Sequence, residues 1–361
     1  MAKPKRVRYK YRQKSSPFRF KRYFLGLVIV VACLMTACHE PHKSPEVTRA
    51  FYYWKSQFNP TGFEKRRLDS LRVQSLYVKF FDVAWDGLQQ KPVPAAKLRI
   101  ADTSWLKQHQ VIPTVFITNE CLFETDSTAI DALAGNITVL MDKFLQLYHL
   151  SNIQEIQLDC NWTSSTKERY FALLRSIKKH YASKTLSATI RLHQVKYRTS
   201  SGIPPVDKGL LMCYNMGNLQ DSTTRNSIID DKEFEKYTRG ISSYNLPLDI
   251  ALPLFDWYVI LRNNRYAGLL HNLPTKTTTS IKAQGNIFSV LKDTVVDGTV
   301  LRKNDILRYE NSDSKTVQRV ISLLKQRAAL KKVTVSLYHV DSLALSKYSY
   351  HELENMYSGF H

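Results

Sequence analysis

Short apolar or β-branched segments alternate with amphipathic segments along most of the chain. The short segments have the length and composition of buried β-strands. Eight such strands are expected, at 50–55, 75–82, 111–118, 154–160, 186–195, 209–215, 248–255 and 333–339. The pattern therefore predicts a protein in which strands and helices follow one another.

Between most of these strands, apolar residues recur at the spacing of three to four residues that marks a helix. The clearest case is 165–182, where Tyr170, Leu173, Leu174 and Ile177 form one stripe. Further helices are expected at 61–72, about 95–109, 127–149, 230–243, 314–331 and 349–357. The connection 196–208 contains Pro, Gly and Ser, and we expect it to lack a full helix.

Eight strands that alternate with about seven helices predict an α/β fold, a (β/α)8 TIM-like barrel over residues 49–361. A doubly wound open sheet is the alternative, but no glycine-rich phosphate loop follows the first strand. The segment 259–310 is too long for an ordinary connection. It predicts a small insertion after strand seven.

Charge is distributed unevenly along the 361 residues. The chain has 52 Lys and Arg against 31 Asp and Glu, a net charge of +21. Residues 1–37 hold ten of the basic side chains and no acidic one, which leaves an excess of 11 for the rest. With no recognisable binding motif, this distribution does not indicate a nucleic-acid partner.

The N-terminus has the features of an export signal. A basic leader ends at Arg22, and an apolar run at 23–35 follows that is too short to span a membrane comfortably. Met35-Thr36-Ala37-Cys38 then resembles the lipobox of bacterial lipoproteins, in which the chain is cut before the cysteine and the thiol is lipidated. The less favoured alternatives are lipidation at Cys33 and an uncleaved anchor.

This resemblance implies a signal peptide at 1–37, a lipidated Cys38 and a short tether at 38–48. The protein would then lie in the bacterial cell envelope, anchored to a membrane and facing the periplasm or the cell exterior.

The three remaining cysteines, Cys121, Cys160 and Cys213, show no CxxC motif and no zinc-ligand spacing. One disulfide is an open alternative, but we expect buried free thiols. Neither a metal ion nor a cofactor is expected.

Alternation places polar side chains on one face of several predicted strands. The set comprises Lys79 in strand two, Gln157, Asp159 and Asn161 in or just after strand four, and Thr189, Arg191 and His193 in strand five. Two interpretations are open. In the first, the charges only pair with one another inside the barrel. In the second, they form the floor of a site at its C-terminal mouth.

Tryptophan placement favours a site. Four of the five Trp lie at or just past predicted strand ends, namely Trp54, Trp85, Trp162 and Trp257. Flat aromatic rings stack on the C–H faces of sugars, so a rim of Trp suits a carbohydrate cleft. Core packing is the alternative for each one.

These residues lie in segments that resemble a known family. The polar spacing in 154–161 is similar to the DxxDxDxE signature of family 18 glycoside hydrolases, the chitinase-like barrels. Segment 212–215 resembles that family's MxYD motif, 251–256 its GxPxYG motif, and 51–54 its first strand. The resemblance covers most of residues 50–340 in order. It implies a glycan or oligosaccharide as the ligand.

The departures from the family pattern concern the chemistry. The family's acid, a Glu, falls on Asn161, and three of its Asp fall on Gln154, Gln157 and Asn215. Among the residues of the family's usual chemistry, only Asp159 and Tyr214 are retained. An Asn side chain has no proton of suitable pKa to donate to a leaving group.

Hydrolysis would therefore need a second carboxylate beside Asp159, since glycosidases use two carboxyl groups roughly 5–9.5 Å apart. The candidates at strand ends are Asp82, Asp86, Glu120 and Asp341. Asp86 precedes a glycine and has a turn role as its alternative, and Glu120 has a loop or capping role.

Two hypotheses follow. The first is a lipid-anchored, extracytoplasmic glycosidase-like enzyme in which Asp159 and Tyr214 act with Asp82 or Glu120. The second is a catalytically silent barrel that binds a glycan or a partner. In both, the expected contacts come from the four Trp, Gln157, Asn161, His193 and Asn215.

Overall fold

The structure is a computed structural model that describes residues 45–221, 223–274, 279–328 and 330–361, with a few of the first ten. The predicted signal peptide, Cys38 and most of the tether lie outside the described residues. Within the described residues, no helix has both the length and the apolar character needed to cross a membrane.

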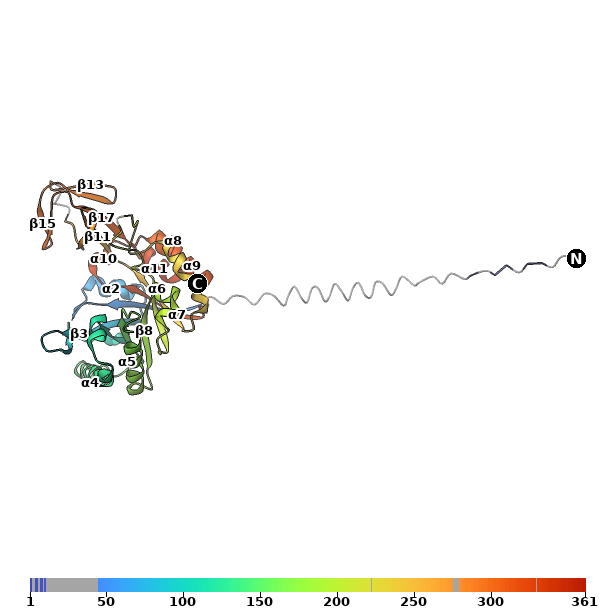
Figure 1. Ribbon diagram of the computed structural model, residues 1–361, viewed down its shortest axis with the longest axis horizontal. Helices are drawn as coiled ribbons and strands as arrows, with labels where there is room; N and C mark the ends of the chain where they lie inside the picture. Colours follow the sequence, from blue (N-terminus) through green and yellow to red (C-terminus); the bar gives the residue numbers. More distant parts are fainter. Residues whose placement is uncertain are drawn as a thin grey trace. The chain divides into compact units, whose positions relative to one another are not determined.

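Eight parallel strands form a closed barrel (Figure 1). In chain order they are β1 (Glu46–Tyr53), β3 (Ser75–Asp86), β6 (Gln110–Ile117), β7 (Glu155–Cys160), β8 (Thr185–Arg191), β9 (Lys208–Met212), β10 (Leu248–Pro253) and β18 (Lys332–Tyr338). The first strand pairs with both the second and the last, which closes the sheet. The predicted barrel is confirmed, and the alternative of an open sheet is wrong.

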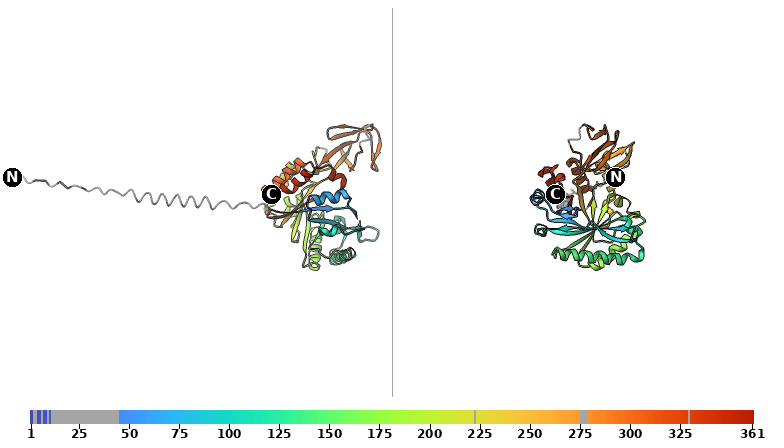
Figure 2. Two further views of the ribbon diagram at one scale, coloured as in Figure 1. Left: turned by 180° about the vertical axis from the view of Figure 1, so that it is seen from behind. Right: turned by 90° about the vertical axis from the view of Figure 1, so that its left-hand side faces the viewer.

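Helices surround the barrel, as Figure 2 shows from two further sides. The longer ones are α2 (Gly62–Ser70), α3 (Asn119–Glu124), α4 (Ile130–Leu147), α5 (Lys167–His180), α8 (Asp231–Thr238), α9 (Ser314–Arg327) and α11 (Tyr350–Ser358). Their apolar stripes explain the packing: in α5 the predicted stripe of Tyr170, Leu173, Leu174 and Ile177 is buried. Short turns complete the set, at α6 (Leu192–Lys196), α7 (Arg198–Ser201), α10 (Ser342–Ser346), η1 (Leu106–Gln108), η2 (Ser127–Ala129) and η3 (Ile241–Ser243).

The predicted helix at 95–109 is wrong. Strand β3 continues to Asp86, turns, and returns as the antiparallel β4 (Lys91–Ala95), which contains Pro92 and Pro94. The chain then adds β5 (Arg99–Ile100), which pairs with β2 (Gln57–Phe58), and only one short 3-10 turn. Proline removes a backbone donor, which helices cannot tolerate but an outermost strand can.

The fifth barrel strand is shorter than expected. It ends at Arg191, whose backbone N–H donates to Gln194 Oε1 at 2.8 Å, and α6 begins at once. The connection that follows contains only the four-residue α7, in line with the expectation that it lacks a full helix.

The insertion after strand seven is a separate antiparallel sheet with its own apolar core. It consists of β11 (Asp256–Arg262), β12 (Arg265–Leu270), β13 (Ile281–Gln284), β14 (Ile287–Val290) and β17 (Ile306–Asn311), with the hairpin β15 (Thr294–Val296) and β16 (Thr299–Leu301). It thus slightly exceeds the expected 259–310. Buried Glu310 joins the insertion to the loop after β9. Its carboxylate accepts a hydrogen bond of 2.9 Å from Trp257 Nε1 within the insertion and one of 2.9 Å from the backbone N–H of Ser227 in that loop.

Candidate functional site

The inward face of β7 carries a polar row, as alternation predicted. Gln157 is fully buried in the barrel interior. Its Oε1 accepts from the Tyr52 hydroxyl at 2.5 Å, and its Nε2 lies 3.4 Å from Ser187 Oγ. A side chain so enclosed and so well paired stabilises the barrel, so the structure gives Gln157 no access to a ligand.

Asp159 lies two residues further towards the mouth and is also buried. Its Oδ1 accepts a hydrogen bond of 2.5 Å from Thr189 Oγ1 on the neighbouring strand. Burial raises the pKa of the Asp159 carboxyl, while the Thr189 hydrogen bond and the Arg191 charge oppose that rise. Asp82 also raises this pKa, and Lys79 lowers it, so both side chains lie within electrostatic reach.

A β-bulge brings Asp82 to this place. The register between β3 and β6 pairs Lys79 with Thr114 and Phe81 with Val115, which leaves Phe80 as the extra residue. Phe80 and Phe81 both pack against Phe144 of α4. The inward alternation therefore passes from Lys79 to Asp82 rather than to Phe81.

Asp82 and Asp159 consequently occupy one level of the barrel. Each is registered with Phe116 of the strand between them, so about 10 Å separates their Cα atoms. Lys79 Nζ lies 3.0 Å from Asp82 Oδ1, which keeps this carboxylate paired with a cation.

Asn161 lies just after β7. Its Oδ1 accepts a hydrogen bond from Arg191 Nε. Lys79 lies beside Asp82, and Arg191 lies within electrostatic reach of Asp159. Among the described residues, no ion pair joins Asp159 to Lys79 or Arg191, so the predicted paired network of these three residues is replaced by a Lys79–Asp82 pair beside Asp159.

Aromatic rings line the barrel above these charges. Tyr338, at the end of β18, lies 6.0 Å from Trp54, 5.6 Å from Tyr52 and 5.4 Å from Tyr214, measured between ring centroids. Trp54 is half-buried, with Lys79 Nζ 5.3 Å from its ring centre. Tyr214 is buried, and burial raises the pKa of its hydroxyl. One partly accessible indole therefore stands at the edge of an aromatic lining.

The other three predicted rim tryptophans lie elsewhere. Trp162 is buried and stacks on Tyr170 of α5 at 5.1 Å, so its predicted exposed position is wrong. Trp257 is buried against Glu310 in the insertion. Trp85 is half-buried in the β3–β4 hairpin, where alternation places it on the face opposite Asp82. Packing against the barrel's own helices and insertion, not a common rim, accounts for these three.

Three further candidates are exposed outside the cluster. Glu120 lies in the first turn of α3, and Asp82, not Glu120, is the carboxylate that acts on the pKa of Asp159. His193 lies on α6, so its predicted inward position in strand five is wrong. Asn215 follows β9 with a positive φ of 54°.

Asp86 and Asp341 have local structural roles. Asp86 accepts from the backbone N–H groups of Leu88 and Gln89 in the hairpin turn, the alternative that its following glycine suggested. Asp341 is the N-cap of α10 and pairs with Lys55 at 3.0 Å.

A second polar cluster lies at the opposite end of the barrel. Lys208 Nζ is 2.7 Å from both Glu155 and Asp249, and Ser187 donates to Glu155 at 2.6 Å. Burial alone would lower the pKa of Lys208, but Asp249 and Glu155 raise it above its usual value. The charges of this cluster are therefore paired with one another.

The cysteines are free and buried, as expected. Burial raises the pKa of the Cys121 thiol to about 11, which leaves it unreactive near neutral pH. Among the described residues, no group of three or more His, Cys, Asp or Glu side chains is arranged to hold a metal ion.

Comparisons with known proteins support the fold. No family model matches the sequence, and a search of curated proteins finds no match. Among solved structures, the spore cortex-lytic enzyme SleL of Bacillus cereus superposes with a TM-score of 0.53 at 15% identity, over 88% of this chain and 75% of that one. A chitinase from Bacteroides thetaiotaomicron gives 0.52 at 12% identity, over 88% and 97%.

A chitinase from Chromobacterium violaceum gives a TM-score of 0.50 at 11% identity, over 86% of this chain and 98% of that one. The chain thus has the barrel fold of chitinase-like glycoside hydrolases of family 18. At this level of identity the likeness concerns the fold alone.

Sequence reasoning missed Tyr52, Phe116 and Tyr338 as lining residues. Alternation along the first and last strands would have placed Tyr52 and Tyr338 inward, next to Trp54.

Proposed function

We propose that this protein binds a glycan at the barrel mouth without hydrolysing it. The observation that carries the proposal is that, among the described residues, no free carboxyl group is seen beside Asp159. Asn161, on which the family's acid falls in the motif resemblance, is held by Arg191, and the nearest alternative carboxylate, Asp82, is paired with Lys79. The barrel keeps an aromatic lining suited to a sugar but offers no free acid beside Asp159.

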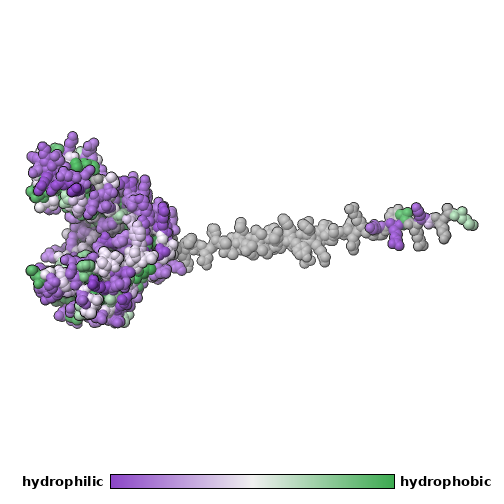
Figure 3. Space-filling view, viewed as in Figure 1, coloured by the Kyte–Doolittle hydropathy of each residue, from purple (hydrophilic) through white to green (hydrophobic). Residues whose placement is uncertain are grey.

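The partly accessible Trp54 is the proposed stacking surface, with Tyr338 and Tyr214 behind it. A sugar ring presents C–H groups to an aromatic face and hydroxyls to polar side chains. Arg191 and Asn161 would supply those polar contacts at the mouth. Figure 3 shows the surface to be mainly hydrophilic, with a hollow below the insertion at the upper left.

We further propose that the protein acts outside the cytoplasm as a lipoprotein of the bacterial cell envelope, anchored through Cys38. The support is the sequence of the leader and of Met35-Thr36-Ala37-Cys38. Metabolic labelling with a radioactive fatty acid tests this: label that disappears in Cys38→Ala supports the anchor, and label that persists contradicts it.

Hydrolysis by Asp159 and Asp82 is the second candidate. The bulge at Phe80 favours it, because it aims Asp82 into the barrel at the level of Asp159. Inward-pointing side chains on Cα atoms about 10 Å apart can bring their carboxyls into the range that glycosidases use. For this chemistry Asp82 would have to leave Lys79 when a glycan binds, and one of the two carboxyls would act as the acid while the other acts as nucleophile or base.

A glycan panel tests both candidates in one experiment. Binding is measured by calorimetry, and released reducing ends are measured on the same oligosaccharides. The proposal expects saturable binding, weakened in Trp54→Ala, and no release. Release that is lost in both Asp82→Asn and Asp159→Asn would replace it by the hydrolase. Absence of both binding and release would refute both.

A further inference from the structure

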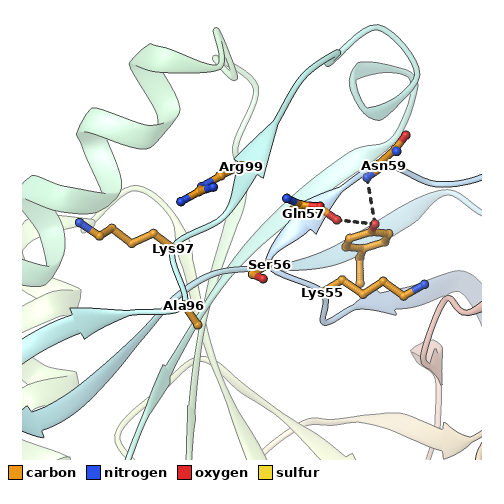
Figure 4. Close-up of a pocket in the computed structure, with 8 residues that line it drawn as sticks. Lys55, Ser56, Gln57, Asn59, Ala96, Lys97 and Arg99 are labelled. Atoms are coloured by element: carbon orange, nitrogen blue, oxygen red, sulfur yellow. Dashed lines mark hydrogen bonds between the residues drawn. The ribbon is translucent and has the colours of Figure 1, made fainter. Parts of the chain in front are cut away.

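A basic cleft lies at the rim of the barrel, beside the candidate site. Its volume is about 910 Å³. Figure 4 shows its walls, which come from the segment after β1 and from the segment between β4 and β5. The lining residues with polar side chains are Tyr53, Lys55, Ser56, Gln57, Asn59, Lys97 and Arg99.

The charges of this cleft are all of one sign. Lys55, Lys97 and Arg99 line it, and no carboxylate does. The charge of Lys55 is offset by two ion pairs, with Asp341 at 3.0 Å and with Glu64 at 3.4 Å. Lys97 and Arg99 are exposed, and no ion pair joins either to an acid of the described chain. Two cations therefore remain to attract an anion.

The chemistry of the walls suits an oxyanion. An Arg guanidinium binds a carboxylate or a phosphate through two parallel N–H groups, and a Lys adds a point charge. The Gln57 and Asn59 amides and the Ser56 hydroxyl, on the neighbouring segment, are neutral donors that also line the cleft.

The backbone of both walls is fixed before any ligand arrives. Arg99 N–H donates to Ser56 O at 2.9 Å, and Leu98 N–H donates to Phe80 O at 2.7 Å. The Tyr53 hydroxyl donates to Gln57 O at 2.7 Å and accepts from Asn59 N–H at 3.0 Å. Ala96 holds a positive φ of 43°, which a residue with a Cβ adopts at some cost. The backbone of such a site therefore needs no reordering on binding.

The cleft lies at the same end of the barrel as the aromatic lining. Trp54, the proposed stacking residue, stands in the chain between the lining residues Tyr53 and Lys55. Trp54 packs inside the mouth and Tyr53 packs against Phe58 on the other face of the chain. A glycan seated on Trp54 would therefore extend over the rim of the barrel to place a substituent among the cations.

We propose that this cleft binds an anionic substituent, a carboxylate or a phosphate, on the glycan that occupies the barrel mouth. The inference rests on the proposed function and deepens it, because it assigns the ligand to the acidic glycans.

The experiment compares three oligosaccharides of equal length: one neutral, one carrying a carboxylate and one carrying a phosphate. Inorganic phosphate alone and anionic lipid vesicles serve as further probes. We expect the intact protein to bind at least one acidic oligosaccharide about tenfold more tightly than the neutral one. In K97Q/R99Q that preference should vanish while neutral-glycan affinity stays unchanged.

A matched control carries the same loss of charge elsewhere. Lys292 and Lys303 are exposed cations of the insertion and do not line the cleft. K292Q/K303Q should keep the preference, and thermal unfolding should show both double variants folded.

Several results would overturn the inference. They are equal affinity for all three oligosaccharides, a preference that survives K97Q/R99Q, an equal loss in K292Q/K303Q, or a preference seen only with free phosphate or vesicles. Trp54-dependent binding of the neutral oligosaccharide in any of these cases would leave the proposed function standing. Absence of all glycan binding would overturn both.

Discussion

The barrel interior holds two polar clusters that differ in how completely their members satisfy each other. At one end, Lys208 bridges Glu155 and Asp249. At the mouth, Asp159 and Asp82 share a level with Lys79 and Arg191, under a half-buried Trp54. Glu155 and Asp159 lie on the same strand, four residues apart. Position along one strand therefore separates a cluster that stabilises the fold from one that can meet a ligand.

Comparison of the two clusters shows that buried charge alone does not identify a site. The Lys208 cluster is as polar as the mouth cluster, yet each charge has a partner and the aromatic lining lies elsewhere. At the mouth, aromatic rings and charges occur together, and one indole stays accessible. This combination, more than any single perturbed residue, is what suits a glycan.

The largest effect on stability is expected at the Lys208 cluster. Lys208→Met leaves two buried carboxylates without their cation, so the free energy of unfolding should fall by about 3–5 kcal/mol. Chemical denaturation measures the loss, and glycan affinity of the folded protein should stay unchanged. Lys332→Met is the control, since its pair with Glu46 is exposed and should contribute little. A small loss for Lys208→Met would mean that the two clusters do not differ as described.

Substitutions at the barrel mouth should change glycan affinity rather than stability. Trp54→Ala removes the proposed stacking face, so glycan affinity should fall about tenfold, or about 1.4 kcal/mol. Calorimetry on the folded variant measures this. Trp162→Ala removes a buried Trp of the same size and should lower stability while leaving affinity intact. A loss of affinity in Trp162→Ala, with affinity retained in Trp54→Ala, would contradict the proposed site.

A smaller effect concerns the pH dependence of stability. The pKa of Asp159 is raised by burial, so the folded state keeps this proton over a range of pH in which the unfolded state has lost it. Stability therefore falls as pH rises through that range. In Asp159→Asn this decrease should disappear, and the variant's relative stability should grow with pH.

Glu354 gives the opposite sign and serves as the control. Its bidentate hydrogen bonds from Arg49 lower its pKa, so its contribution is present above the unfolded-state pKa and is lost as pH falls. The stability deficit of Glu354→Gln should shrink towards acid. Denaturation midpoints across acidic pH measure both variants, and parallel curves for the two would contradict these assignments.

Much of the fold could be predicted, because the strands of a barrel are short apolar segments at regular spacing. The β3–β4 hairpin could not, since no periodicity marks the extension of a strand through Trp85 and Asp86. The bulge at Phe80 also has no local signal, because Phe80 and Phe81 both find room against Phe144 only in the folded protein.

The site was predicted in part. Strand alternation identified Asp159 and Arg191, and Asp82 was proposed as a partner carboxylate. The positions of Trp162 and Trp257 could not be deduced, because a residue just past a strand end packs inward or outward according to its helices and insertions. Lys79 was placed correctly, but its partner depends on the bulge.

The most direct test of the central claim is simultaneous measurement of glycan binding and of reducing-end release on one panel of oligosaccharides. We expect saturable binding that Trp54→Ala weakens, with no release above the buffer blank. Release that disappears in Asp159→Asn would contradict it and make the protein a hydrolase.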